Sequence, residues 1–218
     1  MKKLLFENRY FLLPYLVFLL VFVALAPFYT KAEMHIWANQ FHTPFFDQFF
    51  SNITNLGDRI AVFIAGIIFL FISYRYTITF TIGTLITSSI VHLFKQVLMA
   101  EALRPSKYFL EFETYQLYLI EGYKLQGEQS FPSGHTSSAF NIFFMLTLIT
   151  KNKNFKIVYF ILALAVAFSR VYLSMHFFID TVVGSLIAVI SVIMAYKWVQ
   201  SWEASWLDGS IIKKSRRT

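Results

Sequence analysis

The residues best suited to chemistry in this 218-residue chain lie at the ends of apolar stretches, in four separate segments. Ionisable groups near membrane depth are expensive to place there and are usually paired or functional. A set of cations, histidines and one carboxylate suits phosphoryl transfer, because a phosphate monoester carries close to two negative charges and several acceptor oxygens. Lysine and arginine donors neutralise such a group well. The residues are Lys95, Arg104, Arg170, His135, His176 and Asp180.

His176 and Asp180 could supply a nucleophile and its orienting partner. They are four residues apart, a spacing that places two side chains on the same face of a helix. Asp180 would accept a hydrogen bond from one ring nitrogen of His176 and leave the other free to attack phosphorus. His135 would protonate the leaving oxygen and later deprotonate the water that releases the phosphate. The reaction then needs no metal ion or other cofactor, because the cations hold the transition-state charge.

The segment at residues 132–134 leads into a predicted helix, where backbone N–H groups would point at an anion. Gly134 permits close approach of the backbone, and Ser133 adds a hydroxyl. Each feature is common by itself, since a His and an Asp at this spacing often form a structural pair. A Lys near the end of a span often just reaches toward the interface. Their arrival at one membrane face from four segments favours the functional interpretation.

Composition predicts an all-α integral membrane protein. Apolar residues make up 57% of the chain and charged residues 14%, against about 25% charged in an ordinary soluble domain. This balance excludes intrinsic disorder, and the absence of cysteine excludes a disulfide scaffold. A spanning helix needs about 20 residues, so we predict a single domain, residues 1–218, built as a six-transmembrane-helix bundle. The predicted spans are residues 11–29, 60–74, 77–99, 135–150, 156–173 and 177–199.

The basic residues orient this bundle. With the N-terminus inside, 12 of the 19 Lys and Arg fall in cytoplasmic segments and nine of the 12 acidic residues fall outside, as the positive-inside rule predicts. The N-terminus resembles a signal peptide, but its apolar run is too long and Pro27 should hinder cleavage. We therefore expect both termini in the cytoplasm and a site that faces the periplasm from the bacterial inner membrane. The net charge of +7 then reflects topology, and we expect no nucleic-acid partner.

Two long outer loops remain. The first, residues 30–59, is rich in aromatic side chains and suits either an interfacial anchor, which we favour, or a guide for a lipid substrate. The second, residues 100–132, suits either a hairpin or an interfacial helix. His35 and His42 look like surface or interface residues, and His92 like a residue that hydrogen-bonds between helices. The tail, residues 208–218, is polar and basic and suits a loose or lipid-associated segment.

The chain resembles the type 2 phosphatidic acid phosphatase superfamily, which has three motifs. The second motif, Pro-Ser-Gly-His, is matched by residues 132–135. The third, Ser-Arg, five residues, His, three residues, Asp, is matched by residues 169–180 with full spacing. The first, Lys, six residues, Arg-Pro, is wider here, with eight residues between Lys95 and Arg104. The resemblance implies His176 as nucleophile, His135 as acid and base, and Asp180 as the residue that orients His176. It also implies phosphate ligands: Lys95, Arg104, Ser133, Gly134 and Arg170.

We therefore expect a metal-independent lipid phosphatase that acts on a phosphorylated membrane lipid. The segment Asn-Leu-Gly-Asp at residues 55–58 and the short chain length resemble those of bacterial phosphatases of the lipid A or undecaprenyl pyrophosphate type. Lipid A is slightly favoured over undecaprenyl pyrophosphate, phosphatidylglycerophosphate and phosphatidic acid. The alternatives are a phosphotransferase, a protein that binds or transports such a lipid without turnover, and a metal-dependent hydrolase with His135, His176 and Asp180 as ligands. The sequence carries no sign of an oligomeric state.

Overall fold

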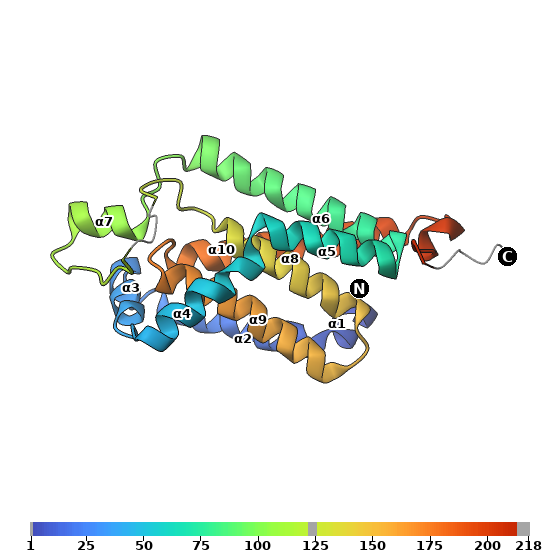
Figure 1. The fold of residues 1–218 in the computed structure, drawn as a ribbon, viewed down its shortest axis with the longest axis horizontal. Helices are drawn as coiled ribbons and strands as arrows, with labels where there is room; N and C mark the ends of the chain where they lie inside the picture. The colour runs from blue at the N-terminus through green and yellow to red at the C-terminus, as the bar shows by residue number, and fades with distance from the viewer. Residues whose placement is uncertain (1, 122–125, 213–218) are drawn as a thin grey trace.

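The computed structural model describes residues 2–121 and 126–212, and within those ranges the chain is helical without any strand. The long helices lie side by side, and the short helices α3 and α7 lie at one end (Figure 1). The helices are α1 (Lys2–Glu7), α2 (Arg9–Leu25), α3 (Lys31–Asn39), α4 (Pro44–Ile53), α5 (Arg59–Ile72), α6 (Tyr74–Leu93), α7 (Pro105–Phe112), α8 (Gly134–Ile149), α9 (Lys153–Tyr172) and α10 (Phe178–Gln200). Short turns accompany them: η1 (Thr54–Gly57), η2 (Phe94–Leu98, π-helical) and η3 (Ser205–Asp208).

Helix α8 packs at the centre of the bundle, against α6, α9 and α10. Its side chains Phe140 and Phe144 are fully buried, and the ring of Phe11 in α2 packs on both. Helices α6 and α10 approach closely at Gly83, where a Cβ would lie 3.4 Å from the Cα of Val192. A small residue at such a crossing lets two backbones come together. This packing fixes the helix ends that carry the polar residues.

Helices occur at all six predicted positions, close to the predicted limits, but six membrane spans are not confirmed. By length and composition, three of the described helices could cross a membrane: Tyr74–Leu98, Lys153–Tyr172 and Phe178–Gln200. The pair Pro44–Gly57 and Arg59–Ile72, bent by 51°, passes the same test only when taken together. Helices α2 and α8 have 17 and 16 residues, fewer than the roughly 20 of a full span.

The two predicted loops contain short helices. Residues 30–59 form α3, α4 and η1, and α3 begins with a capping box between Thr30 and Glu33. On α4 the rings of Phe45, Phe46 and Phe49 are exposed, as suits a helix at the lipid headgroup level. For residues 100–132 the expected structure is either a hairpin or a helix. A helix, α7, forms near the start of this segment, and the rest of its described residues are irregular.

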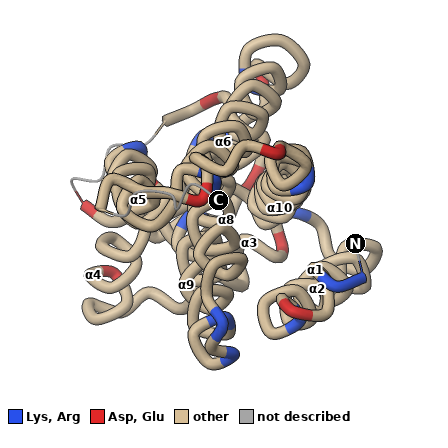
Figure 2. Tube along the Cα trace, turned by 90° about the vertical axis from the view of Figure 1, so that its right-hand side faces the viewer, with Lys and Arg blue, Asp and Glu red and all other residues tan. Residues whose placement is uncertain are grey.

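The first and last described helical segments, α1 and η3, lie at one end of the bundle, at the right in Figure 1. Figure 2 views that end and shows Lys and Arg positions beside the N-terminus and around the start of α9. The basic tail at residues 213–218 lies outside the described residues. The helix ends that carry the predicted site residues lie toward the opposite end of the bundle (Figure 1).

Candidate active site

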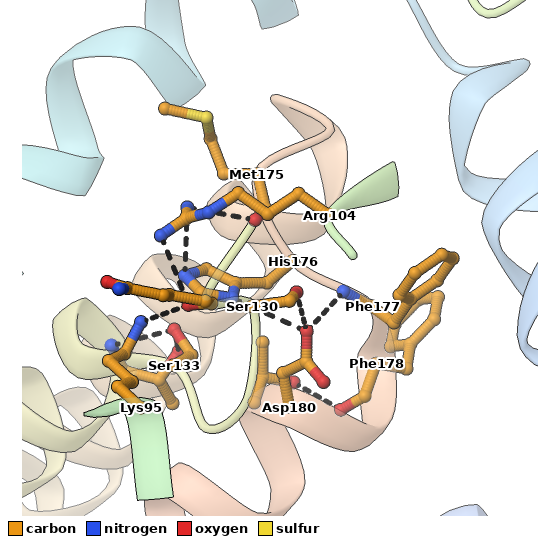
Figure 3. Close-up of polar contacts among 12 residues, drawn as sticks. Lys95, Arg104, Ser130, Ser133, Met175, His176, Phe177, Phe178 and Asp180 are labelled. Atoms are coloured by element: carbon orange, nitrogen blue, oxygen red, sulfur yellow. Dashed lines mark hydrogen bonds and ion pairs between the residues drawn. The ribbon is translucent and has the colours of Figure 1, made fainter. Parts of the chain in front are cut away.

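Segments from distant parts of the chain bring the predicted site residues to the end of the bundle away from the termini. Figure 3 shows Lys95, Arg104, His176 and Asp180 grouped around Ser130. Lys95 lies in η2, Arg104 immediately precedes α7, and Asp180 lies in the first turn of α10. The remaining predicted residues lie at the start of α8 and the end of α9: Ser133, Gly134, His135 and Arg170.

The His176 imidazole lies between a carboxylate and a guanidinium, and the residue is 2% exposed. Its Nδ1 lies 3.4 Å from Oδ2 of Asp180, and its Nε2 lies 3.5 Å from Nη1 of Arg104. The prediction that His176 and Asp180 share a helix face is wrong, because α10 begins only at Phe178. The pair forms across the helix start instead, and Nε2 faces the cations.

The Asp180 carboxylate also caps the start of α10. Its Oδ2 accepts hydrogen bonds from the backbone N–H of Phe177, at 3.0 Å, and from the hydroxyl of Ser130. Unpaired N–H groups in the first helical turn favour a carboxylate there. These bonds fix the oxygen that faces His176 Nδ1. Sequence reasoning missed Ser130, whose one signal is its position two residues before Pro132.

Lys95 and Arg104 converge on one backbone carbonyl despite their wide spacing. Lys95 Nζ donates to the Gln129 carbonyl oxygen at 2.6 Å, and Arg104 Nη2 donates to the same oxygen at 3.4 Å. The π-helical turn η2 carries Lys95, and such a turn accommodates an extra residue within a helix. Arg104 also donates to the carbonyls of Glu128, at 2.9 Å, and Met175, at 3.1 Å. The eight-residue spacing therefore leaves both cations at the same site.

Arg170 approaches the site from the end of α9. It is buried, and its Nη1 donates to the Thr54 hydroxyl at 2.8 Å. Thr54 belongs to η1, so the aromatic loop at residues 30–59 supplies a side chain that holds a predicted phosphate ligand. Sequence reasoning missed Thr54, because the contact joins residues more than 100 positions apart.

Burial is the main influence on the charge of the site. It holds the pKa of His176 well below its usual value, and the positive charges of Arg104, Arg170 and Lys95 act in the same direction. His176 is therefore neutral at neutral pH, the state in which a ring nitrogen can act as a nucleophile. Burial, followed by the charge of Arg170, lowers the pKa of Arg104 to about 10, which still leaves Arg104 protonated at neutral pH.

Ser133 and Gly134 shape the start of α8 in different ways. The Ser133 hydroxyl oxygen accepts hydrogen bonds from Thr136, from its hydroxyl at 2.9 Å and from its backbone N–H at 3.4 Å. The second bond is typical of an N-cap residue. This hydroxyl is engaged within its own helix. At Gly134, apart from the chain neighbours and the nearby backbone of α8 itself, no described atom lies within 4 Å of the position a Cβ would take. The backbone N–H groups of the helix start are therefore approachable beside Gly134.

A cavity of about 700 Å³ opens beside these residues. Lys95, His135 and Asp58 line it, as do the polar residues Thr87, Ser88, Ser138 and Asn141. His92 also lines this cavity and is exposed. The interpretation of His92 as a hydrogen-bonding residue between helices therefore does not hold.

Of the two histidines expected at the surface or the interface, His35 is buried and His42 is half-buried. His35 is 0% exposed, and its Nε2 lies 3.1 Å from Oγ of Ser174. The side chain of His42 is 6% exposed, and its Nδ1 lies 2.7 Å from Oδ1 of Asp47. Both belong to the aromatic loop, which folds back onto the bundle. Loop residues that become buried in this way carry no periodic signal in the sequence.

The buried histidines predict a loss of stability in acid. Burial, followed by the charge of His42, lowers the pKa of His35 from 6.5 to about 3, and the pKa of His176 is lowered likewise. Below pH 6.5 the unfolded chain therefore binds protons at these rings that the folded chain does not bind. The stability that these rings contribute above pH 6.5 is lost as the pH falls. Each ring accounts for at most about 1.4 kcal/mol per pH unit.

Thermal unfolding in detergent measures this effect. We expect the unfolding temperature to fall between pH 6.5 and roughly pH 5, and to fall less steeply in His35→Gln, because glutamine does not titrate. Equal slopes in the two proteins would contradict the assignment of a buried, neutral His35.

Comparisons with known proteins match the sequence to a protein family and the fold to a solved structure. The model of a family described as the PAP2 superfamily matches residues 76–204, a range that contains every predicted site residue. The chain is also similar to the crystal structure of Aquifex aeolicus LpxE, with 25% sequence identity and a TM-score of 0.67. That match covers 76% of this chain and 93% of the LpxE chain. No curated protein gives a significant match.

Proposed function

The chain belongs to the PAP2 superfamily, and from this membership we propose that it removes phosphate from a membrane lipid. The membership confirms the resemblance drawn from the motifs, and together with the likeness to LpxE it supports a lipid phosphatase. The observation that carries the mechanism is the environment of His176. Its Nε2 faces Arg104, while its Nδ1 faces Asp180. A phosphate group bound by Arg104 would lie next to the nitrogen that attacks it.

In the proposed reaction, Nε2 of His176 attacks phosphorus, and the bond from phosphorus to the leaving oxygen breaks. His135 enters this step protonated and gives its proton to that oxygen, and the three cations balance the charge of the transition state. His135 then takes a proton from water, whose oxygen attacks the phospho-histidine. Inorganic phosphate leaves, and His176 is neutral again. Asp180 stabilises the positive charge that the ring acquires while it carries the phosphoryl group.

We favour lipid A as the substrate because of the cavity beside His135. Its volume of about 700 Å³ and its lining of serine, threonine and asparagine residues suit hydrogen bonds to sugar hydroxyls. Undecaprenyl pyrophosphate, phosphatidylglycerophosphate and phosphatidic acid are the other candidates, since one fold with one set of motifs serves many substrates.

The proposed location is the periplasmic face of the bacterial inner membrane, with both termini in the cytoplasm. Two observations support it. The first and last described helical segments, α1 and η3, share one end of the bundle (Figure 1), and Lys and Arg gather there (Figure 2). Basic residues prefer the cytoplasmic side, so the site at the opposite end would face the periplasm.

The alternatives make different demands on this site. A phosphotransferase would pass the phosphoryl group from His176 to an alcohol and would depend on that acceptor. A binding or transport protein would need no nucleophile and would keep its function in His176→Ala. For a metal-dependent hydrolase, no group of three or more His, Cys, Asp or Glu among residues 2–121 and 126–212 is placed to hold an ion.

Phosphate release by the purified protein in detergent tests the proposal. The assay contains excess chelator and offers lipid A, undecaprenyl pyrophosphate, phosphatidylglycerophosphate or phosphatidic acid separately. We expect the highest kcat/KM with lipid A and no loss of rate in chelator. Activity only after addition of a divalent metal would contradict the proposed mechanism. Release that requires an added alcohol would favour the phosphotransferase.

Gly134→Ala tests whether the phosphate sits at the start of α8. We expect an unchanged or slightly raised unfolding temperature, because Ala is favoured over Gly in a helix by about 0.5–1 kcal/mol. The added methyl group should obstruct the ligand and raise KM roughly tenfold, equivalent to about 1.4 kcal/mol of lost binding. Steady-state kinetics and thermal unfolding measure the two quantities. An unchanged KM would mean that the phosphate binds elsewhere.

A further inference from the structure

The connection between α9 and α10 makes a sharp turn just before His176. The backbone N–H groups of Met175 and His176 both donate to the carbonyl oxygen of Arg170, each at 3.0 Å. Ser174 completes the turn with φ at 52°, in the left-handed region where helices usually end with Gly. The orientation of the His176 ring therefore depends on a turn that has an unfavourable residue at its centre.

The side chain of Ser174 explains why a residue other than Gly occupies this position. Its hydroxyl lies 3.1 Å from Nε2 of His35, and Ser174 is 1% exposed. The His35 ring is held between two other rings, those of Phe109 and Phe177, with centroid distances of 5.5 Å to each. His35 thus reaches the turn from α3, a helix that contributes no phosphate ligand.

Two further contacts hold the same short segment. Arg104 Nη1 donates to the Met175 carbonyl at 3.1 Å, and the Phe177 N–H donates to Asp180 at 3.0 Å. Those two partners belong to the site itself. The bond from His35 is different, because it fixes the residue at the apex of the turn from outside the site.

We propose that His35 is a positioning residue for the reaction: through Ser174 it fixes the turn that presents the His176 imidazole to the phosphate. The inference rests on the proposed function, because it assigns His35 a role in that reaction. Loss of the bond lets the turn relax, so fewer molecules hold Nε2 in line with the phosphorus atom. The phosphate ligands come from other segments, so substrate binding is retained. The effect therefore falls on kcat and leaves KM nearly unchanged.

Two variants break the bond from opposite sides. We expect His35→Ala and Ser174→Gly each to lower kcat roughly 10- to 100-fold, as a small misplacement of a reacting group does, with KM within about twofold of wild type. Ser174→Gly also removes the left-handed strain, so its unfolding temperature should not fall. The double variant should be no slower than the slower single variant, because both changes remove one interaction.

Asn39→Ala is the matched control. Asn39 lies on the same helix, is 4% exposed, and bonds the backbone of Tyr118 at 3.0 and 2.9 Å instead of the turn. We expect its kcat to stay within about twofold of wild type even if its unfolding temperature falls. A drop in kcat as large as that of His35→Ala would overturn the proposal, because general docking of α3 would then explain both. A normal kcat in Ser174→Gly would overturn it as well. An inactive wild-type protein would instead refute the proposed function.

Discussion

His176→Ala should abolish phosphate release, with kcat lowered roughly 10⁴-fold or more, as is typical when a nucleophile is removed. The reason lies in the surroundings of the ring. His176 is buried, its pKa is held well below the usual value, and its Nε2 faces Arg104. The residual kcat is measured from phosphate release over hours. Thermal unfolding checks that the variant is folded.

Asp180→Asn is the graded comparison for that experiment. It keeps His176 but removes the negative charge 3.4 Å from Nδ1, so we expect a smaller loss of about 10²- to 10⁴-fold in kcat. If His176→Ala retained more activity than Asp180→Asn, His176 would not be the nucleophile.

Gly57→Ala should displace His135 and reduce both stability and activity. A Cβ at residue 57 would overlap the backbone carbonyl oxygen of His135 and lie 2.9 Å from Cγ1 of Val166. Backbone atoms at the start of α8 cannot rotate away as a flexible side chain can. We expect a loss of about 1–3 kcal/mol in stability, as for other overpacked sites. Because His135 would move, kcat should fall roughly 100-fold.

Gly66→Ala is the control for that substitution. Gly66 lies in α5, and outside the chain neighbours and the nearby backbone of that helix the nearest atom to a Cβ there would be Cε1 of Phe80, at 3.9 Å. The added methyl group fits, so stability should stay the same or rise by up to about 1 kcal/mol, and kcat should not change. Equal kcat in Gly57→Ala and Gly66→Ala would contradict a role for the contact between η1 and His135.

The six long helices could be predicted from the sequence because each is a mainly apolar run with a recognisable end, whereas the short helices α3 and α4 form within a segment expected to be a loop. Helix α8, for example, starts after Ser133, which accepts from the Thr136 N–H, and ends at Ile149 before a polar segment. The number of spans could not be predicted in the same way. The bend of 51° between Pro44–Gly57 and Arg59–Ile72 depends on how η1 packs against α8 and α9, which the local sequence does not encode.

The residues of the candidate site also fall into those that could be predicted from the sequence and those that could not. Residues that carry charge at the ends of apolar runs, such as Lys95 and Arg170, could be singled out from the sequence. Ser130, Thr54 and His35 could not, because each makes its contact with a residue distant in the chain. A hydroxyl or an imidazole in a polar loop looks the same whether it faces solvent or another loop.

Trapping of a covalent intermediate tests the central claim most directly. A lipid labelled with ³²P at its phosphate is mixed with the wild-type protein and with His135→Ala. The variant should form the intermediate slowly, because the leaving oxygen receives no proton, and hydrolyse it slowly, because no base activates water, so both proteins are sampled over a series of times. The reactions are quenched in alkali, where a phospho-histidine survives, and the label is located by peptide mass spectrometry. We expect one labelled site, His176, with label that is lost in acid and is absent from His176→Ala. Turnover without any label on His176 in either protein would contradict the phospho-histidine mechanism.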